Sequence, residues 1–529
     1  MNIIIKNGVI VDGSNSSRYK GDIGIHNTMI TEIGDLDERN YDKVIDAEGK
    51  IVSPGFIDTH SHSDLYILED PTVKPKIMQG ITTEILGQDG VSMAPLPTEF
   101  IGPWRKNIAG LDGDSDNINW NYKTTDGYLK DIEKKRPCTN VAYLVPHGNV
   151  RMEAMGLSNR KPSNEEIEKM KDIVRREIEA GAIGISTGLI YMPCAYSESN
   201  EIIEMCKVVA EFDGVFVVHQ RSEADDILES MEEVLEIGRQ SGIRIHFSHF
   251  KVCGKNNWDK LDKVIEILSS GEKEGLKISF DQYPYVAGST TLGVILPPWV
   301  HDGGTDELLK RLCDYELRKK MIYDIENGIS GWDNFIEFAG LDNIVVTSVK
   351  NEKNKDAIGK SLIELGELKG KNPYDATFDL LYEEENAVGM VDFYGTEDHV
   401  KRIMKLPQMN LCTDGLLGEG KPHPRVYGSF PRLLGKYVRE EKTLTLEEAI
   451  YKMTYKASST FKIKKRGLIK IGYYADLIIF DENTIKDNGT FTDPVKYPSG
   501  IKYVMVNGKV SVKEGQYIND RSGIIIRKK

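Results

Sequence analysis

Residues 55–62 read Gly-Phe-Ile-Asp-Thr-His-Ser-His, a short apolar run that ends in polar side chains. Seven later runs have the same strand-like character, and helical patterns such as Asn164 to Ala180 separate many of them. These runs cover residues 82–86, 140–145, 182–186, 215–218, 243–247, 277–280 and 410–412. Strands that alternate with helices of this length favour an α/β fold, a (β/α)8 TIM-like barrel, over a sandwich.

Both ends of the chain differ from this middle part and read as short strands with turns. Asn7-Gly8 lies between two apolar runs near the N-terminus, and Asn507-Gly508 lies between two near the C-terminus. Asn-Gly between two strand-like runs is a strong hairpin signal. We therefore expect a hairpin at each end and a small β-sandwich domain formed by both chain ends. Two unrelated flanking hairpins are the alternative.

The 529 residues, 40% of them hydrophobic, suffice for one large enzyme domain and a smaller one. We assign residues 1–53 and 465–529 to the small β domain and residues 54–464 to the catalytic barrel. Two further strand-like runs, near residues 343–349 and 387–393, exceed the count of eight. We therefore expect an insertion near residues 286–349.

Charge and cysteine content narrow the class of protein. The formal net charge of −14 argues against a general nucleic-acid binder, whose footprint is usually basic. The six cysteines include no CxxC pair, which is typical of a reduced, cytoplasmic protein. The opening apolar run is too short for a signal peptide, and no stretch of about 20 apolar residues predicts a membrane span. We expect no nucleic-acid or membrane partner, and the sequence indicates no oligomeric state.

Four histidines follow three of the predicted strands. His60 and His62 are two residues apart, so in a strand they share one face and can hold one metal ion. His219 and His249 end two later strands, and the carboxyl ends of barrel strands meet at one face. These four side chains are therefore expected to converge on a metal, while His246 faces the other way and is structural. The alternative is that His60 and His62 are ordinary surface residues.

A carboxylate follows the last predicted barrel strand. Residues 410–415 read Asn-Leu-Cys-Thr-Asp-Gly, which puts Asp414 at the same end of the barrel as the histidines. A carboxylate beside a metal can take a proton from the attacking water and pass it to the leaving amine. We predict that Asp414 is this general acid/base. An aspartate before glycine is also common in turns and caps, which is the alternative.

With these residues the chain resembles the amidohydrolase superfamily and, within it, the D-aminoacylases (N-acyl-D-amino-acid deacylases). The resemblance runs nearly end to end, and the Tyr-Pro-Tyr and His-Pro-Arg stretches point to the deacylase branch. The matching stretches are residues 5–13, 54–62, 184–191, 248–251, 281–289, 413–415, 423–425, 466–467, 472–476 and 506–508.

The resemblance implies a (β/α)8 barrel with a small β domain, in agreement with the strand pattern. It also implies zinc, one or two ions, held by His219 and His249, with a second, weaker position at His60 and His62. The residue matching Asp414 is implied to be the general acid/base.

The chain departs from its relatives at one turn. Better-studied deacylases carry a metal-ligating cysteine in a Gly-Asn-Cys-Gly turn, whereas residues 87–90 read Gly-Gln-Asp-Gly here. The aligned ligand would be Asp89, a harder ligand than thiolate, so another divalent metal could serve. The fourth strand ends in Ser186-Thr-Gly without a lysine, which argues against the carbamylated-lysine bridge of hydantoinases and dihydroorotases.

An N-acyl amino acid carries a free α-carboxylate, which arginine, lysine and tyrosine side chains bind well. Lys251 follows His249 by two and is expected to share its strand face. Tyr283 and Arg425 lie in substrate-binding stretches of the family, as do Tyr191 and Ser289. For each, a purely structural role is the alternative.

The predicted activity is metal-dependent hydrolysis of the amide bond of N-acyl-D-amino acids to a carboxylate and a free D-amino acid. The preference for D over L substrates comes from the resemblance alone. A related amidohydrolase acting on D-dipeptides or a cyclic amide is the first alternative, and a non-catalytic binding homologue is the second. His147 and a pair formed by Arg221 and Glu223 are expected to support the site from behind.

Overall fold

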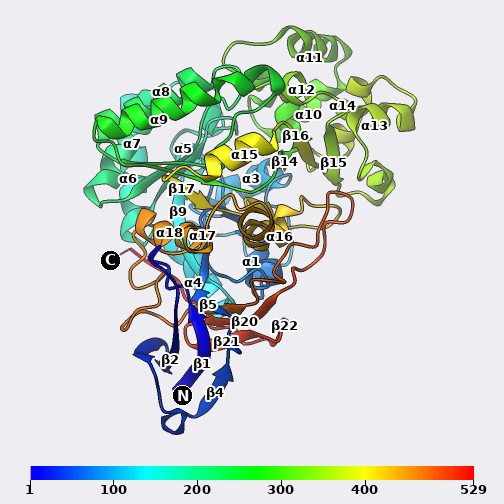
Figure 1. Ribbon diagram of the computed structural model, residues 1–529. Coiled ribbons are helices and arrows are strands. Elements are labelled where there is room, and N and C mark those ends of the chain that lie inside the picture. The colour runs from blue at the N-terminus through cyan, green and yellow to red at the C-terminus, as the bar shows by residue number, and fades with distance from the viewer. Residues whose placement is uncertain (1, 529) are drawn as a thin grey trace.

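The computed structural model describes residues 2–528, and its centre is a parallel eight-stranded barrel (Figure 1). The strands are hydrogen-bonded in chain order, and each of the eight predicted runs overlaps one of them, so the fold class is confirmed. The barrel strands are β6 (Phe56–Asp58), β8 (Ile81–Leu86), β9 (Asn140–Pro146), β10 (Gly184–Gly188), β11 (Val215–His219), β12 (Arg244–Phe247), β13 (Ile278–Gln282) and β17 (Met409–Leu411).

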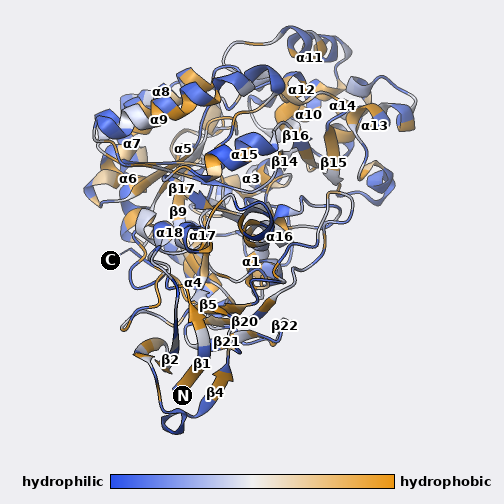
Figure 2. Ribbon diagram, in the orientation of Figure 1, coloured by the Kyte–Doolittle hydropathy of each residue, from blue (hydrophilic) through white to orange (hydrophobic). Residues whose placement is uncertain are grey.

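Amphipathic helices surround these strands. The main ones are α3 (Ile101–Ile108), α4 (Thr125–Lys135), α5 (His147–Met155), α6 (Asn164–Glu179), α7 (Ser199–Glu211), α8 (Ile227–Ser241), α9 (Leu261–Lys273), α15 (Glu397–Met404), α16 (Arg425–Arg432), α17 (Leu446–Met453) and α18 (Tyr455–Thr460). Helix α6 begins at a capping box formed by Ser163 and Glu166 and buries Met170, Val174 and Ile178. Figure 2 shows the matching pattern, with hydrophobic strands inside and helices that carry both colours.

The first and last barrel strands meet at a buried polar seam. Two short strands that extend them, β7 (Ser61–His62) and β18 (Gly415–Leu416), pair in parallel. Beside this pair, the Asp58 carboxylate accepts from the backbone N–H of Thr413 at 2.8 Å. The Lys76 ammonium donates to Asp58 Oδ2 at 2.8 Å and to Thr413 Oγ1 at 2.6 Å. These three side chains are completely buried, and together they join β6 to β17.

Strands from both chain ends pair in one nine-stranded sheet, which lies at the bottom of Figure 1 with its blue and red strands side by side. Its strands are β1 (Asn2–Ile10), β2 (Tyr19–His26), β3 (Met29–Gly34), β4 (Lys43–Asp46), β5 (Ile51–Pro54), β19 (Leu477–Phe480), β20 (Ile501–Val506), β21 (Lys509–Lys513) and β22 (Gln516–Tyr517). The antiparallel pair of β5 and β19 joins the two ends. The domain bounds at residues 53 and 465 remain our proposal.

The hairpin predicted at Asn7-Gly8 is wrong, because these residues lie inside the single strand β1. Ile5 pairs with Ile23 and Gly8 with Gly21, so Lys6 and Asn7 together face the single residue Asp22. This is a β-bulge, and Asn7 takes the left-handed backbone that it needs, with φ of 57°. At the bulge, β1 changes its parallel partner from β4 to β5.

The hairpin at Asn507-Gly508 is present. Val506 pairs with Lys509, and the two turn residues have positive φ values of 48° and 76°. Two residues with positive φ make the type I′ turn whose twist suits a hairpin.

A separate unit is inserted between β13 and β17 and is drawn in green at the upper right of Figure 1. Its three-stranded sheet consists of β14 (Ala287–Thr291), β15 (Ile344–Ser348) and β16 (Gly389–Phe393), in the order β14-β16-β15. Helices α10 (Thr305–Cys313), α11 (Tyr315–Asn327), α12 (Phe335–Ala339), α13 (Leu362–Lys369) and α14 (Pro373–Glu383) complete it around its own core. Because β16 pairs antiparallel with β14, this unit extends beyond the predicted end at residue 349.

Within residues 2–528, no helix is both long and apolar enough to cross a membrane. All six cysteines are free, and five of them are buried. The cytoplasmic location stays a prediction.

The buried seam generates a prediction about stability. Lys76→Met leaves the Asp58 carboxylate buried without its cation, which should destabilise the protein by about 3–5 kcal/mol. Urea denaturation followed by circular dichroism measures this loss. The matched control is Lys130→Met, which removes an exposed ion pair with Asp126 and should cost at most about 1 kcal/mol. Equal effects of the two substitutions would contradict the role of the seam, and adding Asp58→Asn to Lys76→Met should recover part of the loss.

Candidate metal centre and active site

The four predicted histidines meet at the carboxyl ends of the barrel strands. His60 and His62 follow β6, His219 is the last residue of β11, and His249 lies two residues beyond β12. The Nε2 atoms of His60 and His62 are 3.2 Å apart, and His219 Nδ1 lies 2.9 Å from His249 Nε2. The ring centroids of His60 and His249 are 5.0 Å apart, which joins the two pairs into one buried cluster.

Asp89 reaches this cluster from the turn after β8. Its Oδ2 atom lies 3.5 Å from the Nε2 atoms of both His60 and His62, and its Oδ1 atom lies 3.8 Å from His249 Nε2. Burial opposes ionisation of this carboxyl, but the three histidines outweigh burial and hold its pKa well below the ordinary value. The carboxylate is therefore charged and faces three imidazoles.

The turn that carries Asp89 is tightly enclosed. A Cβ on Gly87 would lie 2.3 Å from the carbonyl oxygen of Leu144, and one on Gly90 would lie 2.9 Å from Thr187 Cα. Ser186 Oγ donates to the Gly87 carbonyl oxygen and accepts from the Gly90 N–H. Ser186, in the middle of the fourth barrel strand, thus holds the turn of Asp89 in place.

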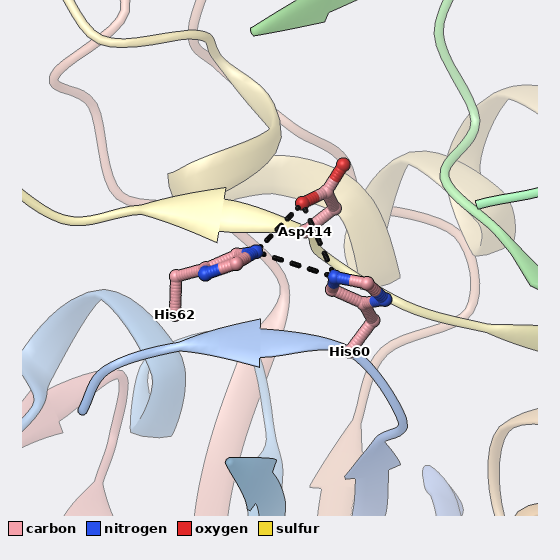
Figure 3. A group of neighbouring side chains, drawn as sticks. All are labelled: His60, His62 and Asp414. Carbon is pink, nitrogen blue, oxygen red and sulfur yellow. Dashed lines mark hydrogen bonds and ion pairs between the residues drawn. The ribbon is translucent and has the colours of Figure 1, made fainter. Parts of the chain in front are cut away.

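Asp414 faces His60 and His62, as Figure 3 shows. Its Oδ1 atom is 3.4 Å from His62 Nε2 and 3.7 Å from His60 Nε2, while its Oδ2 atom is 2.9 Å from Arg425 Nη1. Burial would raise the pKa of Asp414, but Arg425 and the histidines lower it well below the usual range. This carboxylate is ionised and able to accept a proton.

The residues present fit a divalent metal. Three groups have candidate ligand atoms within 4.8 Å of one another: His60, His62 and Asp414; His60, Asp89 and His249; and His219, Glu223 and His249. Asp89 Oδ1 is buried and has no hydrogen-bond partner, as expected for an atom that awaits a cation. Imidazole nitrogens and carboxylate oxygens are ordinary zinc ligands.

The protonation of the second histidine pair is consistent with metal binding. Burial lowers the pKa of His219 to about 4, so this imidazole is neutral and keeps one unprotonated ring nitrogen. Burial also disfavours charged His249, but Glu223 and Asp89 raise its pKa to about 9. A bound cation would displace that proton, as metals do at histidine ligands.

Carboxylates behind the histidines orient their rings. Asp112 Oδ1 lies 3.3 Å from His62 Nδ1, and Glu223 Oε1 lies 3.2 Å from His249 Nδ1. Asp281 accepts from the backbone N–H of His249 at 2.5 Å. Carboxylates in this position fix the tautomer and direction of a metal-binding imidazole. Sequence reasoning did not select Asp112 or Asp281, although Asp281 opens the Asp-Gln-Tyr-Pro-Tyr stretch.

The expected pair of Arg221 with Glu223 is wrong. Arg221 Nε bonds Glu233 at 3.0 Å, whereas Glu223 Oε2 lies 2.6 Å from Lys251 Nζ. Burial disfavours the charged form of Glu223, but Lys251 and the histidines outweigh it and lower the pKa of Glu223 to about 2. Glu223 therefore lies directly at the site, and its spacing of four residues from His219 was the available signal.

The predicted substrate-binding residues line the cavity beside the metal cluster. They are Lys251, Tyr283, Arg425, Tyr191 and Ser289. The Arg425 guanidinium stacks 4.5 Å from the Tyr283 ring centroid and donates to the Ser289 carbonyl oxygen at 2.9 Å. The Ser289 hydroxyl itself donates to the Met390 carbonyl oxygen within the inserted sheet. The shared strand face expected for His249 and Lys251 is wrong, because β12 ends at Phe247 and both follow it in a loop.

Two further histidines, His246 and His147, contact neighbouring protein side chains and have structural roles. His246 contacts Ser279 and Asp281 inside the barrel, as expected. His147 contacts Thr187 at 2.8 Å and Glu201 at 2.9 Å. It stands at the start of helix α5, whose next residue donates its backbone N–H to Gly90 at 2.7 Å. His147 thus supports the turn of Asp89 from behind.

Two residues that sequence reasoning missed come from the inserted unit. Asp392 lies in β16, Tyr394 follows it, and both line the same cavity. Tyr394 Oη lies 2.5 Å from Tyr283 Oη. No local motif marks them, since only the folding of the insertion over the barrel brings them to the site. A larger cavity of about 350 Å³ adjoins this one and shares the walls formed by Leu111, Ile190, Tyr191 and Phe335.

Comparison with known proteins agrees with this fold and site. A family model described as the amidohydrolase family matches residues 43–289 and 365–512. The unmatched stretch lies within the inserted unit.

The chain is similar over its whole length to characterised relatives. A D-aminoacylase of Alcaligenes xylosoxydans xylosoxydans is 32% identical, over 99% of this chain and 97% of its own. The structure of N-acyl-D-glutamate deacylase from Bordetella bronchiseptica, complexed with zinc and a phosphonate inhibitor that mimics the tetrahedral intermediate, has 32% identity and a TM-score of 0.85, with 99% of each chain covered. A D-aminoacylase structure with a binuclear metal centre has 30% identity, a TM-score of 0.83 and the same coverage.

A family model that matches most of the chain and relatives that match it end to end lead to one conclusion. The chain belongs to the amidohydrolase family, in its D-aminoacylase branch.

Proposed function

We propose that the protein hydrolyses the amide bond of N-acyl-D-amino acids and releases a carboxylate and a free D-amino acid. The observation that supports this proposal is the cluster of four buried histidines with Asp89 and Asp414, which lies at a cavity lined by Lys251 and Arg425. Similarity over the whole chain to D-aminoacylase supports it.

His60, His62, Asp89, His219 and His249 would hold one or two zinc ions. When bound, a zinc ion polarises the scissile carbonyl and lowers the pKa of a water from about 15.7 to about 7. The zinc in the structure of the glutamate deacylase relative and the binuclear centre of the D-aminoacylase relative support this choice. A carboxylate at Asp89 is a harder ligand than thiolate, so manganese or cobalt could also serve this centre.

Asp414 would move the proton. Its carboxylate lies beside His60 and His62 and is ionised, so it can accept a proton from the attacking water. Arg425 favours the charged form of Asp414, and the protonated form is therefore a strong acid that readily passes its proton to the leaving nitrogen.

The α-carboxylate of the substrate would bind at Lys251, Arg425 and Tyr283. Lys251 and Arg425 supply charge-assisted hydrogen bonds and Tyr283 a hydroxyl donor, all on the wall of the cavity that contains Asp414. Glu223 and Asp414 hold the two cations in place between substrates. The larger cavity next to the site, which has both apolar and polar walls, offers space for the acyl group.

A substrate panel on metal-loaded protein of measured metal content tests the proposed function. It compares N-acetyl-D-amino acids with their L-enantiomers, with amide-capped D-analogues, with D-dipeptides and with a hydantoin. We expect the free-acid D-substrates to be turned over fastest. Their amide-capped analogues should be about 10- to 100-fold poorer in kcat/KM, because a charge-assisted hydrogen bond is lost. Faster turnover of the dipeptide or hydantoin, or binding without turnover, would contradict the proposal.

Asp414→Asn should reduce kcat by about 10²- to 10⁴-fold while metal content and substrate binding persist. Asparagine keeps the shape of the side chain and tolerates the positive φ of 48° at this position, but it cannot carry the proton. Single-turnover kinetics and elemental analysis measure the two effects. A near-normal kcat in this variant would refute the assigned role.

Asp89→Asn should lower the metal content and the activity together, and Asp89→Cys should restore zinc binding. Asparagine is the matched variant, since it tolerates the φ of 52° at this turn, whereas alanine there would add backbone strain. Metal content by elemental analysis and zinc affinity by competition with a chelator are the measurements. Full metal content and activity in Asp89→Asn would mean that Asp89 only shapes the turn.

A further inference from the structure

Asp392 is a carboxyl group of the active-site cavity that has no cationic partner among the described residues. Asp392 is 3% exposed and, within residues 2–528, forms no ion pair at 4 Å or less. The other acids of the cavity are engaged. Asp414 pairs with Arg425, Glu223 with Lys251, and Asp89 faces the histidines. Asp333 accepts from the backbone N–H of Glu223 and from the Ser222 hydroxyl.

A glycine keeps the space in front of this carboxyl group free. Gly288 of β14 pairs directly with Asp392 of β16. A Cβ on Gly288 would lie 2.9 Å from Asp392 Oδ1, 3.0 Å from Tyr394 Cε1 and 3.5 Å from Tyr283 Oη. Any other residue at position 288 would thus occupy the niche bounded by Asp392 and the two tyrosines.

The charge of this niche suits a cation. Burial raises the pKa of Asp392 to about 7, against the opposing effect of Lys251 and Arg425. A positive group in the niche would restore the ionised form of Asp392. Because Lys251 and Arg425 are each already paired with a carboxylate, Asp392 is left available to pair with a cation that enters the cavity.

The niche lies on the amino-acid side of the site. The niche adjoins Tyr283, and Lys251 and Arg425 lie close enough to lower the pKa of Asp392. These three residues are the ones that we assign to the α-carboxylate. A substrate group that extends from the α-carbon toward β16 passes the aromatic rings of Phe338 and Tyr394, which line the same cavity. An aliphatic stem with a cationic end matches these surroundings.

We propose that Asp392 binds the positively charged side chain of the substrate, so that the enzyme prefers N-acyl-D-amino acids with a basic side chain such as lysine or ornithine. The inference rests on the proposed deacylase function. Lys251 and Arg425 are assigned to the α-carboxylate, and the one other arginine or lysine among the described residues that line the two cavities is Arg221, which is paired with Glu233.

The test measures kcat/KM of the metal-loaded full-length enzyme for N-acetyl-D-lysine, N-acetyl-D-norleucine and N-acetyl-D-glutamate. Norleucine has the same four-carbon side chain as lysine but lacks the terminal ammonium group. We expect the wild type to favour lysine over norleucine by about 10- to 100-fold, the range for a hydrogen bond to a charged group, and to disfavour glutamate. Asp392→Asn should bring the ratio of lysine to norleucine close to one with little change for norleucine.

Two further variants make the test specific to the niche. Gly288→Ala keeps Asp392 but fills the space in front of it, so it should abolish the lysine preference as well. Asp398→Asn removes the same charge from an exposed site on helix α15 and should leave the preference unchanged. Circular dichroism and metal content verify that each variant folds and binds its metal.

The outcomes separate this inference from the proposed function. No lysine preference in the wild type, or an unchanged preference in both Asp392→Asn and Gly288→Ala, overturns the role of Asp392. An equal loss on lysine and norleucine in Asp392→Asn also overturns it, because the carboxylate would then serve the scissile amide or the fold. If no N-acetyl-D-amino acid is turned over, the proposed function itself fails.

Discussion

The active site depends on the seam at which the last barrel strand meets the first. A buried lysine, Lys76, is held between Asp58 of β6 and Thr413 after β17. One residue beyond Thr413, the Asp414 N–H donates to the His60 carbonyl oxygen at 2.9 Å. The charges that close the barrel therefore also set the distance between two histidines and the predicted acid/base. A buried ion pair stabilises little by itself, but removing one partner is costly, so such a seam tolerates few substitutions.

Around the seam, the site is organised by paired charges and strained backbone. Asp89, His249 and Asp414 all adopt positive φ values, of 52°, 33° and 48°. Such conformations cost free energy and persist where the surrounding structure enforces them. Here the positive φ values direct the three side chains toward the shared metal cluster. The same carboxylates that neutralise Lys251 and Arg425 keep these cations in place within a buried cavity.

The barrel and the inserted unit contribute different parts of the chemistry. The strand ends of the barrel carry the candidate metal ligands and Asp414, as in barrel enzymes generally. The insertion supplies Asp392 and Tyr394 through β16 and Asp333 through the loop before α12. Asp333 also holds the loop of Glu223, so the insertion contacts the site directly. Variation of the insertion can therefore change which D-amino acid binds while the hydrolytic centre is kept.

Local sequence determined the eight barrel strands, the histidines at their ends and Asp414. An apolar run identifies a buried strand, and the polar residue that follows it identifies the end of the strand at the active-site face of the barrel. Local sequence did not determine pairings between distant segments. Asn-Gly forms a bulge at residues 7–8 and a hairpin turn at residues 507–508. Both structures use the positive φ that Asn and Gly tolerate, so only the pairing with neighbouring strands decides which of them forms. Glu223 pairs with Lys251 rather than with Arg221, and Asp392 reaches the cavity only because the insertion folds over the barrel. The tertiary structure decided these contacts, because charge pairing and burial act between residues that are close in space and not along the chain.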